Sequence, residues 1–258
     1  MNKPDHPELI AESQMNGVLT LTLGGGTAHA LSLAMITALH DALQSAEARD
    51  DVRVILIHGP GRIFCAGHDM NEIARHRFDP DQGQAFVTRL FEACSSLMQG
   101  LAGLSKPTIA LTEGVATAGG LQMLASCDLV FAAPEASFSL PGVSNGGFCT
   151  TPLVAVGRVL ARKHAMEMAL SGERFDTDWA LSAGLINRVM RAETLLDEAR
   201  EFAQQLAARH APAISAGKAA FSQQMDLPLA QAYEVATQTM IGHFMDSHRI
   251  KRDRDNWG

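Results

Sequence analysis

The chain has 258 residues, of which 47% are hydrophobic and 19% are charged, and its formal net charge is −7 at pH 7. This length and composition predict a globular protein with a full core and exclude an intrinsically disordered chain. The acidic balance gives no reason to expect nucleic acid as a partner. No apolar run approaches the roughly 20 residues of a membrane span, so no membrane association is expected.

The four cysteines give no sign of a metal site or a disulfide framework. Cys65, Cys94, Cys127 and Cys149 form no CxxC pair, and no Cys/His spacing resembles a zinc site. Free thiols in a reducing compartment and no bound metal are therefore expected. The first fourteen residues contain no apolar segment like that of a signal peptide. Together these features predict a cytoplasmic protein.

The first part of the chain alternates short strands with helices. Residues 18–23 alternate apolar and polar side chains, which is typical of a strand. Ser32 is a predicted N-cap for a helix that continues to about Ala48. The mostly apolar residues 53–57 (RVILI) predict a second strand, which Gly59-Pro60-Gly61 would end.

Residues 64–69 (FCAGHD) come next, followed by a polar segment that reaches about Gly83. This segment has few apolar anchors and is expected to be mobile. A helix is predicted over residues 84–101, a strand over 108–111, a short helix over 121–125 and a strand over 129–132. This recurring order predicts an α/β fold with crossover connections.

After Pro152 the chain becomes almost entirely helical. Predicted helices cover residues 161–170, 177–183, 192–209, 213–224 and 229–245, with one strand at 186–190. We place a boundary near residue 200, which separates a core of residues 1–199 from a helical region of residues 200–258. The basic residues near the C-terminus alternate with aspartates and predict a solvated tail, with a contact to an anionic ligand as the alternative.

Two turns that contain glycine are the most informative features of the sequence. In residues 64–69 and in residues 112–128 (TEGVATAGGLQMLASCD), a short apolar strand leads into a polar turn with small residues and glycine. Glycine adds no side-chain bulk and tolerates unusual dihedral angles, so a ligand can approach backbone N–H groups there. A pair of such turns predicts two N–H donors aimed at one oxygen. Such an oxyanion hole stabilises negative charge that develops on a carbonyl.

Within these turns, the backbone groups are better candidates for a functional role than the side chains. Asp69 is predicted to cap the helix that follows the first turn. His68 would donate its backbone N–H, although an imidazole there could also titrate near neutral pH. The N–H of Gly119 would lie beside the positive end of the helix predicted at Leu121. Tight packing between a strand and a helix is the alternative role for the second turn.

A series of motifs from about Val18 to about Val189 resembles the enoyl-CoA hydratase/isomerase superfamily, the crotonases. In chain order these are Ala30–Ser32, Val54–Gly59, Phe64–Asp69, Lys106-Pro107, Glu113–Gly120, Cys127–Leu129, Phe138, Pro141-Gly142, Gly172-Glu173 and Ala180–Ile186. The GHD turn and residues 141–152 (PGVSNGGFCTTP) further resemble the subgroup that contains enoyl-CoA hydratase domain-containing protein 3.

The resemblance implies an α/β fold of the crotonase type, a spiral of ββα units followed by a C-terminal helical region that makes trimers, often paired into hexamers. It implies an acyl-CoA thioester as ligand, with coenzyme A as part of the substrate and no separate cofactor. Position by position, the N–H groups of His68 and Gly119 would be the oxyanion donors. The implied substrate-binding positions are Ala30, Ala66, Gly67, Asp69, Met70, Gly120, Gly142 and Lys218. His29 stands where many relatives have Asn.

The resemblance also implies departures from the usual machinery. Gln122 stands where hydratases carry their first glutamate, and Gly142 stands where hydratases and isomerases carry the second. Hydration of an enoyl thioester needs a base and an acid. Gln122 can hydrogen-bond a water molecule but cannot exchange a proton usefully at neutral pH. Cys149 lies where some relatives place their acid/base group, with a small buried apolar residue as the alternative.

Two nearby carboxylates are not expected to replace the two missing catalytic glutamates. Glu113 is predicted to face away from the site and to bind backbone, and Glu92 to be solvated. Three functions therefore stay open: an enzyme of the hydratase/isomerase type, a noncatalytic acyl-CoA-binding protein, and a thioesterase that uses Cys149 or an activated water. A protease is excluded because no Ser/His/Asp set stands at matching positions.

Overall fold

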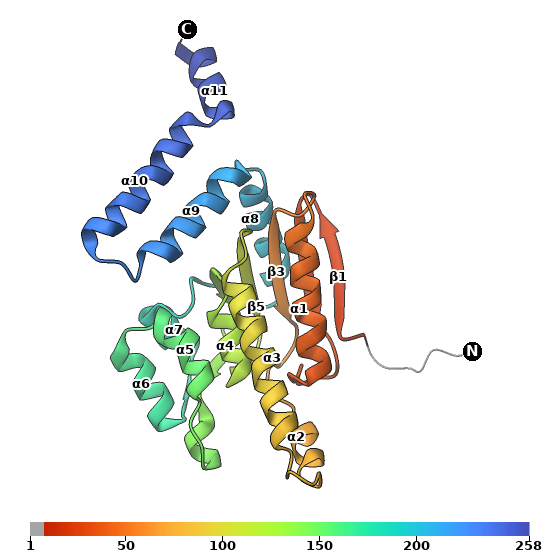
Figure 1. Ribbon diagram of the computed structural model, residues 1–258. Helices are drawn as coiled ribbons and strands as arrows, with labels where there is room; N and C mark the ends of the chain where they lie inside the picture. Colours follow the sequence, from red (N-terminus) through yellow and green to blue (C-terminus); the bar gives the residue numbers. More distant parts are fainter. Residues whose placement is uncertain (1–7, 258) are drawn as a thin grey trace. The chain divides into compact units, whose positions relative to one another are not determined.

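The computed structural model describes residues 8–257 and comprises two compact units that divide between Ala207 and Ala208. Figure 1 shows the elements in chain order. The boundary expected near residue 200 falls inside the last helix of the first unit. The expectation that the chain lacks a signal peptide falls in part on residues 1–7, which lie outside the described residues.

The strands are β1 (Ile10–Met15), β2 (Val18–Leu23), β3 (Val54–Gly59), β4 (Ile63–Cys65), β5 (Thr108–Thr112), β6 (Val115–Thr117), β7 (Leu129–Ala132), β8 (Ser137–Ser139), β9 (Arg174–Phe175) and β10 (Arg188–Val189). The helices are α1 (Leu33–Ala48), α2 (Met70–His76), α3 (Gln84–Ala102), α4 (Gly119–Ala125), α5 (Thr150–Val159), α6 (Arg162–Ser171), α7 (Thr177–Ala183), α8 (Leu195–Ala207), α9 (Ala211–Gln224), α10 (Leu229–Met245) and α11 (Ser247–Trp257), with a 3₁₀ helix η1 (Pro141–Asn145).

The strands form two sheets. The larger sheet has the order β1-β2-β3-β5-β7-β10, and the smaller has the order β4-β6-β8-β9. All pairings are parallel except β1 with β2 and β8 with β9. Along the chain, β3, β5 and β7 of the larger sheet are each followed directly by β4, β6 and β8 of the smaller one. This repeated passage between sheets is the predicted spiral of ββα units, and it confirms the predicted fold.

Both faces of the larger sheet are buried, as β3 illustrates. Ile55 and Ile57 belong to a large core that includes buried side chains of α1, α3 and α4. Val54 and Leu56 point to the opposite face, where they join Leu195 of α8 in a second core. Helices α1 and α3 pack against each other over the sheet (Figure 1). A strand buried on both faces explains why this stretch is continuously apolar rather than alternating.

The segment between β4 and α3 is ordered by local hydrogen bonds, so the prediction of a mobile stretch was wrong. Residues 70–76 form α2, which Asp69 caps by accepting from the N–H groups of Asn71 and Glu72. The carboxylate of Asp81 accepts from the N–H groups of Gly83 and Ala85 where α3 begins. Polar capping side chains supply here the anchors that apolar residues supply elsewhere.

The second unit consists of helices α9, α10 and α11. The C-terminal basic residues expected in a solvated tail instead lie on α11. Asp246 caps this helix by accepting from the N–H groups of His248 and Arg249. Over residues 8–257, we find no helix with the length and apolarity that crossing a membrane requires.

Candidate active site

Three neighbouring strands of the smaller sheet end at one edge. β4, β6 and β8 are parallel and adjacent. The chain leaves them through the turn at residues 66–69, through Ala118 and through Leu140, respectively. Ligands of α/β proteins bind outside the carboxyl ends of parallel strands. The topology therefore brings the two glycine turns and the Pro141-Gly142 turn, which are far apart in sequence, to one place.

The first turn is held by the segment that precedes α1. The N–H of Ala66 donates to the carbonyl of Ala28 (3.0 Å), and the N–H of Leu31 donates to the carbonyl of Gly67 (2.8 Å). Leu31 also accepts from the N–H of Asp69, at 3.3 Å, which makes a parallel bridge opposite His68. In such a bridge the N–H and C=O of the central residue point away from the partner. The N–H of His68 is thus directed away from Leu31.

His29, in the same segment, adopts a backbone conformation that few residue types favour. Its φ of 42° is positive, and its ring Nδ1 lies 3.0 Å from the carbonyl oxygen of Phe64. Asparagine and histidine are both enriched at positive φ. Histidine therefore fits this backbone conformation better than most residue types do.

The second turn contains a strained residue. Ala118 has φ 50° and ψ −120°, which is unusual for a residue with a Cβ atom, and its N–H donates to the carbonyl of Ser139 (3.1 Å). Its own carbonyl accepts from the N–H of Gln122, at 3.0 Å. Gly119 is the first residue of α4, where N–H groups have no partner within the helix.

The two turns touch each other. A Cβ atom placed on Gly67 would lie 3.1 Å from the nitrogen of Gly119, and one placed on Gly119 would lie 3.7 Å from Cε1 of His68. One placed on Gly120 would lie only 2.1 Å from the carbonyl oxygen of Cys65. Across residues 8–257, the N–H groups of His68 and Gly119 have no hydrogen-bond partner. Two unpaired donors thus lie on adjoining turns, which is the arrangement an oxyanion hole requires.

The His68 side chain is enclosed as well. Its ring lies 4.6 Å from that of Phe91 between centroids, and its Nε2 atom is buried without a partner among the described residues. Burial lowers the pKa of His68 from its usual 6.5, which favours the neutral imidazole. The imidazole therefore lines the site as an uncharged ring at neutral pH.

The His68→Gln substitution is expected to keep acyl-CoA binding and to change the pH dependence of stability. The folded protein resists a proton that the unfolded chain accepts, so the free energy of unfolding should fall as the pH drops below 6.5. The free energy of unfolding of the variant should fall less over the same pH range. The lowered pKa of His58 contributes equally to the pH dependence of both proteins. Urea unfolding above and below pH 6.5 measures this difference. Identical pH dependence in the two proteins would contradict the enclosed position of the imidazole.

Gln122 lies on α4 with only 5% of its surface exposed. Its Oε1 atom has no hydrogen-bond partner within the described part of the chain. Buried polar atoms are almost always paired, and an unpaired one calls for a water molecule or a ligand. Since α4 begins at Gly119, this amide lies less than one helical turn from the second donor.

Gly142 leaves no room for a side chain. A Cβ atom there would lie 2.6 Å from the nitrogen of Cys149 and 2.7 Å from the carbonyl carbon of Phe148. The loop is closed by a hydrogen bond from the N–H of Gly147 to the carbonyl of Gly142, at 2.9 Å. A glutamate at this position would require the loop at residues 146–149 to move.

The other predicted site residues are distributed as follows. Cys149 is buried immediately before α5, and burial raises its pKa, which disfavours the thiolate. Met70 is exposed at the start of α2. Glu113 points toward His58 and accepts from the N–H of Gly61, as predicted. Lys218 belongs to α9 in the second unit.

The spiral of two sheets, with unpaired N–H groups where its short strands end, defines an α/β protein of the crotonase class. The model of the enoyl-CoA hydratase/isomerase family matches residues 13–257. The chain belongs to this family. Family membership makes it a crotonase-type acyl-CoA protein.

Three individual members of the family illustrate the similarity. The chain is 38% identical to the mitochondrial enoyl-CoA hydratase domain-containing protein 3 of Rattus norvegicus, over 91% of this chain and 77% of the relative. It is 56% identical to an enoyl-CoA hydratase/isomerase family protein from Silicibacter pomeroyi of known structure, with a TM-score of 0.88 over 92% of this chain and 99% of the other. The structure of human enoyl-CoA hydratase domain-containing protein 3 matches with 32% identity and a TM-score of 0.87, over 94% of this chain and 93% of the other.

Proposed function

We propose that this protein is an acyl-CoA-processing enzyme of the enoyl-CoA hydratase/isomerase type that polarises a thioester carbonyl. The carbonyl oxygen accepts hydrogen bonds from the N–H groups of His68 and Gly119, which stabilise the enolate formed during the reaction. The observation that carries this proposal is the pair of unpaired donors on two touching turns. Removal of one such donor typically costs about 3 kcal/mol of transition-state stabilisation, so the pair supplies much of the catalysis.

In this proposal one bound water molecule adds across the double bond: its oxygen bonds to the β-carbon of the enoyl group, and one of its protons goes to the α-carbon. The buried Oε1 of Gln122 lacks a partner, and a water bonded to it satisfies the amide and stands beside the acyl group. Gln122 orients the water but does not exchange protons with it. No carboxylate fills position 142, where the loop backbone excludes a side chain. Hydration at a low rate, below that of a relative with two glutamates, follows from this composition.

The thioesterase alternative has less support. A nucleophilic thiol needs a lowered pKa, whereas burial raises that of Cys149. The noncatalytic alternative shares the oxyanion hole and differs only in turnover. A measurement of turnover separates the noncatalytic alternative from the proposal.

The test is the change in absorbance of crotonyl-CoA on incubation with purified protein, extended to a panel of enoyl-, 3-hydroxyacyl- and acyl-CoA thioesters. Turnover that adds water to the enoyl double bond supports the proposal. Tight binding in calorimetry without turnover of any member supports the noncatalytic alternative. Release of free CoA thiol without hydration supports the thioesterase instead.

We further propose that the protein is a homotrimer, or a hexamer of two trimers, joined through the helical region that begins at residue 200. Large apolar side chains of the second unit are exposed, and the set comprises Phe221, Met225, Leu229, Tyr233, Met240, Ile241, Phe244, Met245 and Trp257. Exposed apolar surface of this extent marks an interaction site. Sedimentation analysis measures the assembly, and a monomer at micromolar concentration would contradict it.

A cytoplasmic location remains part of the proposal. It rests on the free cysteines, which suit a reducing compartment. The rat relative named above carries the word mitochondrial in its name. Fractionation of cells that express the full protein decides between the two compartments.

A further inference from the structure

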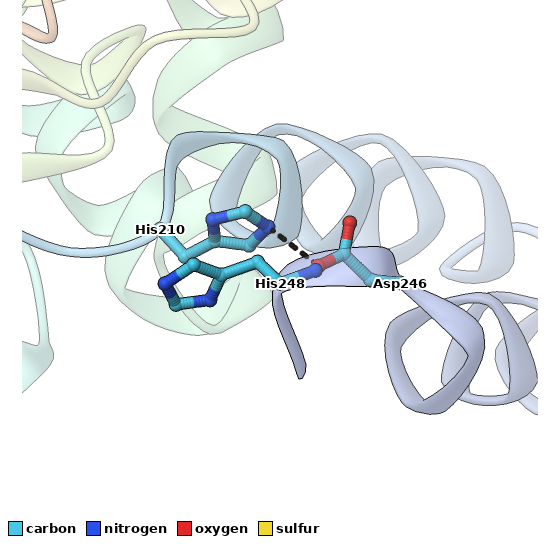
Figure 2. Close-up of side chains that lie close together, drawn as sticks. All are labelled: His210, Asp246 and His248. Carbon is cyan, nitrogen blue, oxygen red and sulfur yellow. Dashed lines mark hydrogen bonds and ion pairs between the residues drawn. The ribbon is translucent and has the colours of Figure 1, made fainter. Parts of the chain in front are cut away.

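Three potential metal ligands meet in the second unit. His210 precedes α9, Asp246 joins α10 to α11, and His248 is the second residue of α11. Figure 2 shows the ring of His248 lying against that of His210, with a dashed line between His210 and Asp246. One ligand atom from each residue lies within 4.8 Å of the others. The cluster draws on both ends of the unit and not on one local turn.

The buried Nε2 atom of His210 is not satisfied by this contact. It lies 3.2 Å from Oδ1 of Asp246, which is an ion-pair distance, but without the alignment of a hydrogen bond. Oδ1 of Asp246 already accepts from the N–H groups of His248 and Arg249. An imidazole nitrogen without an aligned partner therefore lies beside a carboxylate oxygen.

The spacing fits a metal after small side-chain rotations. Three atoms no more than 4.8 Å apart surround a point that is at most about 2.8 Å from each. Zinc binds imidazole nitrogen and carboxylate oxygen at about 2.0–2.2 Å, so each ligand needs to approach by well under 1 Å. The rings of His210 and His248 stack with centroids 4.9 Å apart and an interplanar angle of 13°. His248 is exposed, so its ring can rotate out of the stack toward the common point.

The surroundings offer space and compensated charge. A cavity of about 420 Å³ is lined by all three residues and also by His243, Arg249 and Arg252. Both arginines pair with Asp253, at 2.7 Å from Arg249 and 3.5 Å from Arg252, which offsets their repulsion of a cation. The carboxylate of Asp246, placed between the imidazoles, disfavours an anion in the same position.

We propose that His210, Asp246 and His248 form a binding site for one divalent transition-metal ion of the zinc class. Two imidazoles and one carboxylate are ligands that suit Zn²⁺, Co²⁺ and Ni²⁺, and water completes the coordination. The bound ion ties the start of α9 to the junction of α10 and α11. It therefore stabilises the second unit. Sequence spacing did not reveal this site because His210 lies far along the chain from Asp246 and His248.

The test is titration of the untagged full chain, stripped with a chelator, with Co²⁺ followed by absorption and with Zn²⁺ followed by calorimetry. We expect one ion per chain, with affinity reduced roughly tenfold or more in His210→Ala and His248→Ala, since each removes one of three ligands. His243→Ala is the matched control, because His243 lines the same cavity without belonging to the cluster. It should bind as the parent does.

The Asp246→Asn variant tests whether a loss of metal affinity reflects misfolding. An asparagine still caps α11, so the variant should keep its helical circular dichroism while its affinity for Zn²⁺ falls. Metal-induced elevation of the melting temperature should occur in the parent and in His243→Ala only. Absence of saturable binding in the parent, or equal binding by all four variants, would overturn the proposal.

Discussion

Gly120→Ala is expected to weaken acyl-CoA binding at least tenfold and to lower the free energy of unfolding by about 3 kcal/mol. The added methyl group would lie 2.1 Å from the carbonyl oxygen of Cys65 and 2.7 Å from its Cβ atom. Both atoms belong to the buried end of β4, and α4 is buried along its whole length. The clash must therefore separate the turn at residues 66–69 from Gly119. Urea unfolding and calorimetry with an acyl-CoA measure the two effects.

Gly157→Ala provides the matched control for this substitution. Gly157 lies on α5, is exposed, and a Cβ atom there would meet no atom within 4 Å. Alanine is favoured over glycine by about 1 kcal/mol within a helix, so this variant should be slightly more stable. It should bind acyl-CoA as the parent does. Equal effects of the two substitutions would show that the contact between the turns has no importance for binding.

The second large effect is expected from Gln122→Glu, which should raise the rate of crotonyl-CoA hydration by about 100-fold. The position is buried beside Gly119, and the unpaired Oε1 marks where a carboxylate oxygen would lie. A carboxylate there can take a proton from the water that the amide only orients. Burial raises the pKa of a carboxyl group, so the activity of the variant should rise with pH until this group is ionised.

Gln122→Met is the control for the gain of activity. Methionine has a similar volume but neither accepts a proton nor holds the water, so hydration should fall below that of the parent. Calorimetry with a saturated acyl-CoA should give similar affinities for all three proteins, because none of the changes touches the two N–H donors. If the glutamate variant hydrates crotonyl-CoA no faster than the methionine variant, Gln122 does not face the reacting atoms.

The sequence predicted the long elements and the two turns well, since their signals are local. Ser32 caps α1 and Asp69 caps α2, as their types and positions indicated. The strands β4, β6 and β8 were not predicted, because three residues are too few to show a period. These are the strands whose ends assemble the site, so sequence periodicity alone could not have brought the turns together. The family resemblance, and not periodicity, predicted that the two turns lie together.

Other features depend on contacts that no local pattern encodes. The positive φ of Ala118 carries no sequence signal, because alanine rarely adopts it. The need for glycine at position 142 arises from the backbone of residues 148 and 149, and is visible only in three dimensions. The start of helix α2 was predicted from Asp69, but its extent was not, because its segment is polar and its ends are set by caps and not by an apolar face.

A crystal structure of the protein with a stable acyl-CoA analogue bound tests the central claim most directly. The account predicts that the thioester carbonyl oxygen lies about 3 Å from the backbone nitrogens of both His68 and Gly119, with a water molecule on the amide of Gln122. A carbonyl oxygen that accepts from neither nitrogen, in a complex with the acyl group otherwise ordered, would contradict the account.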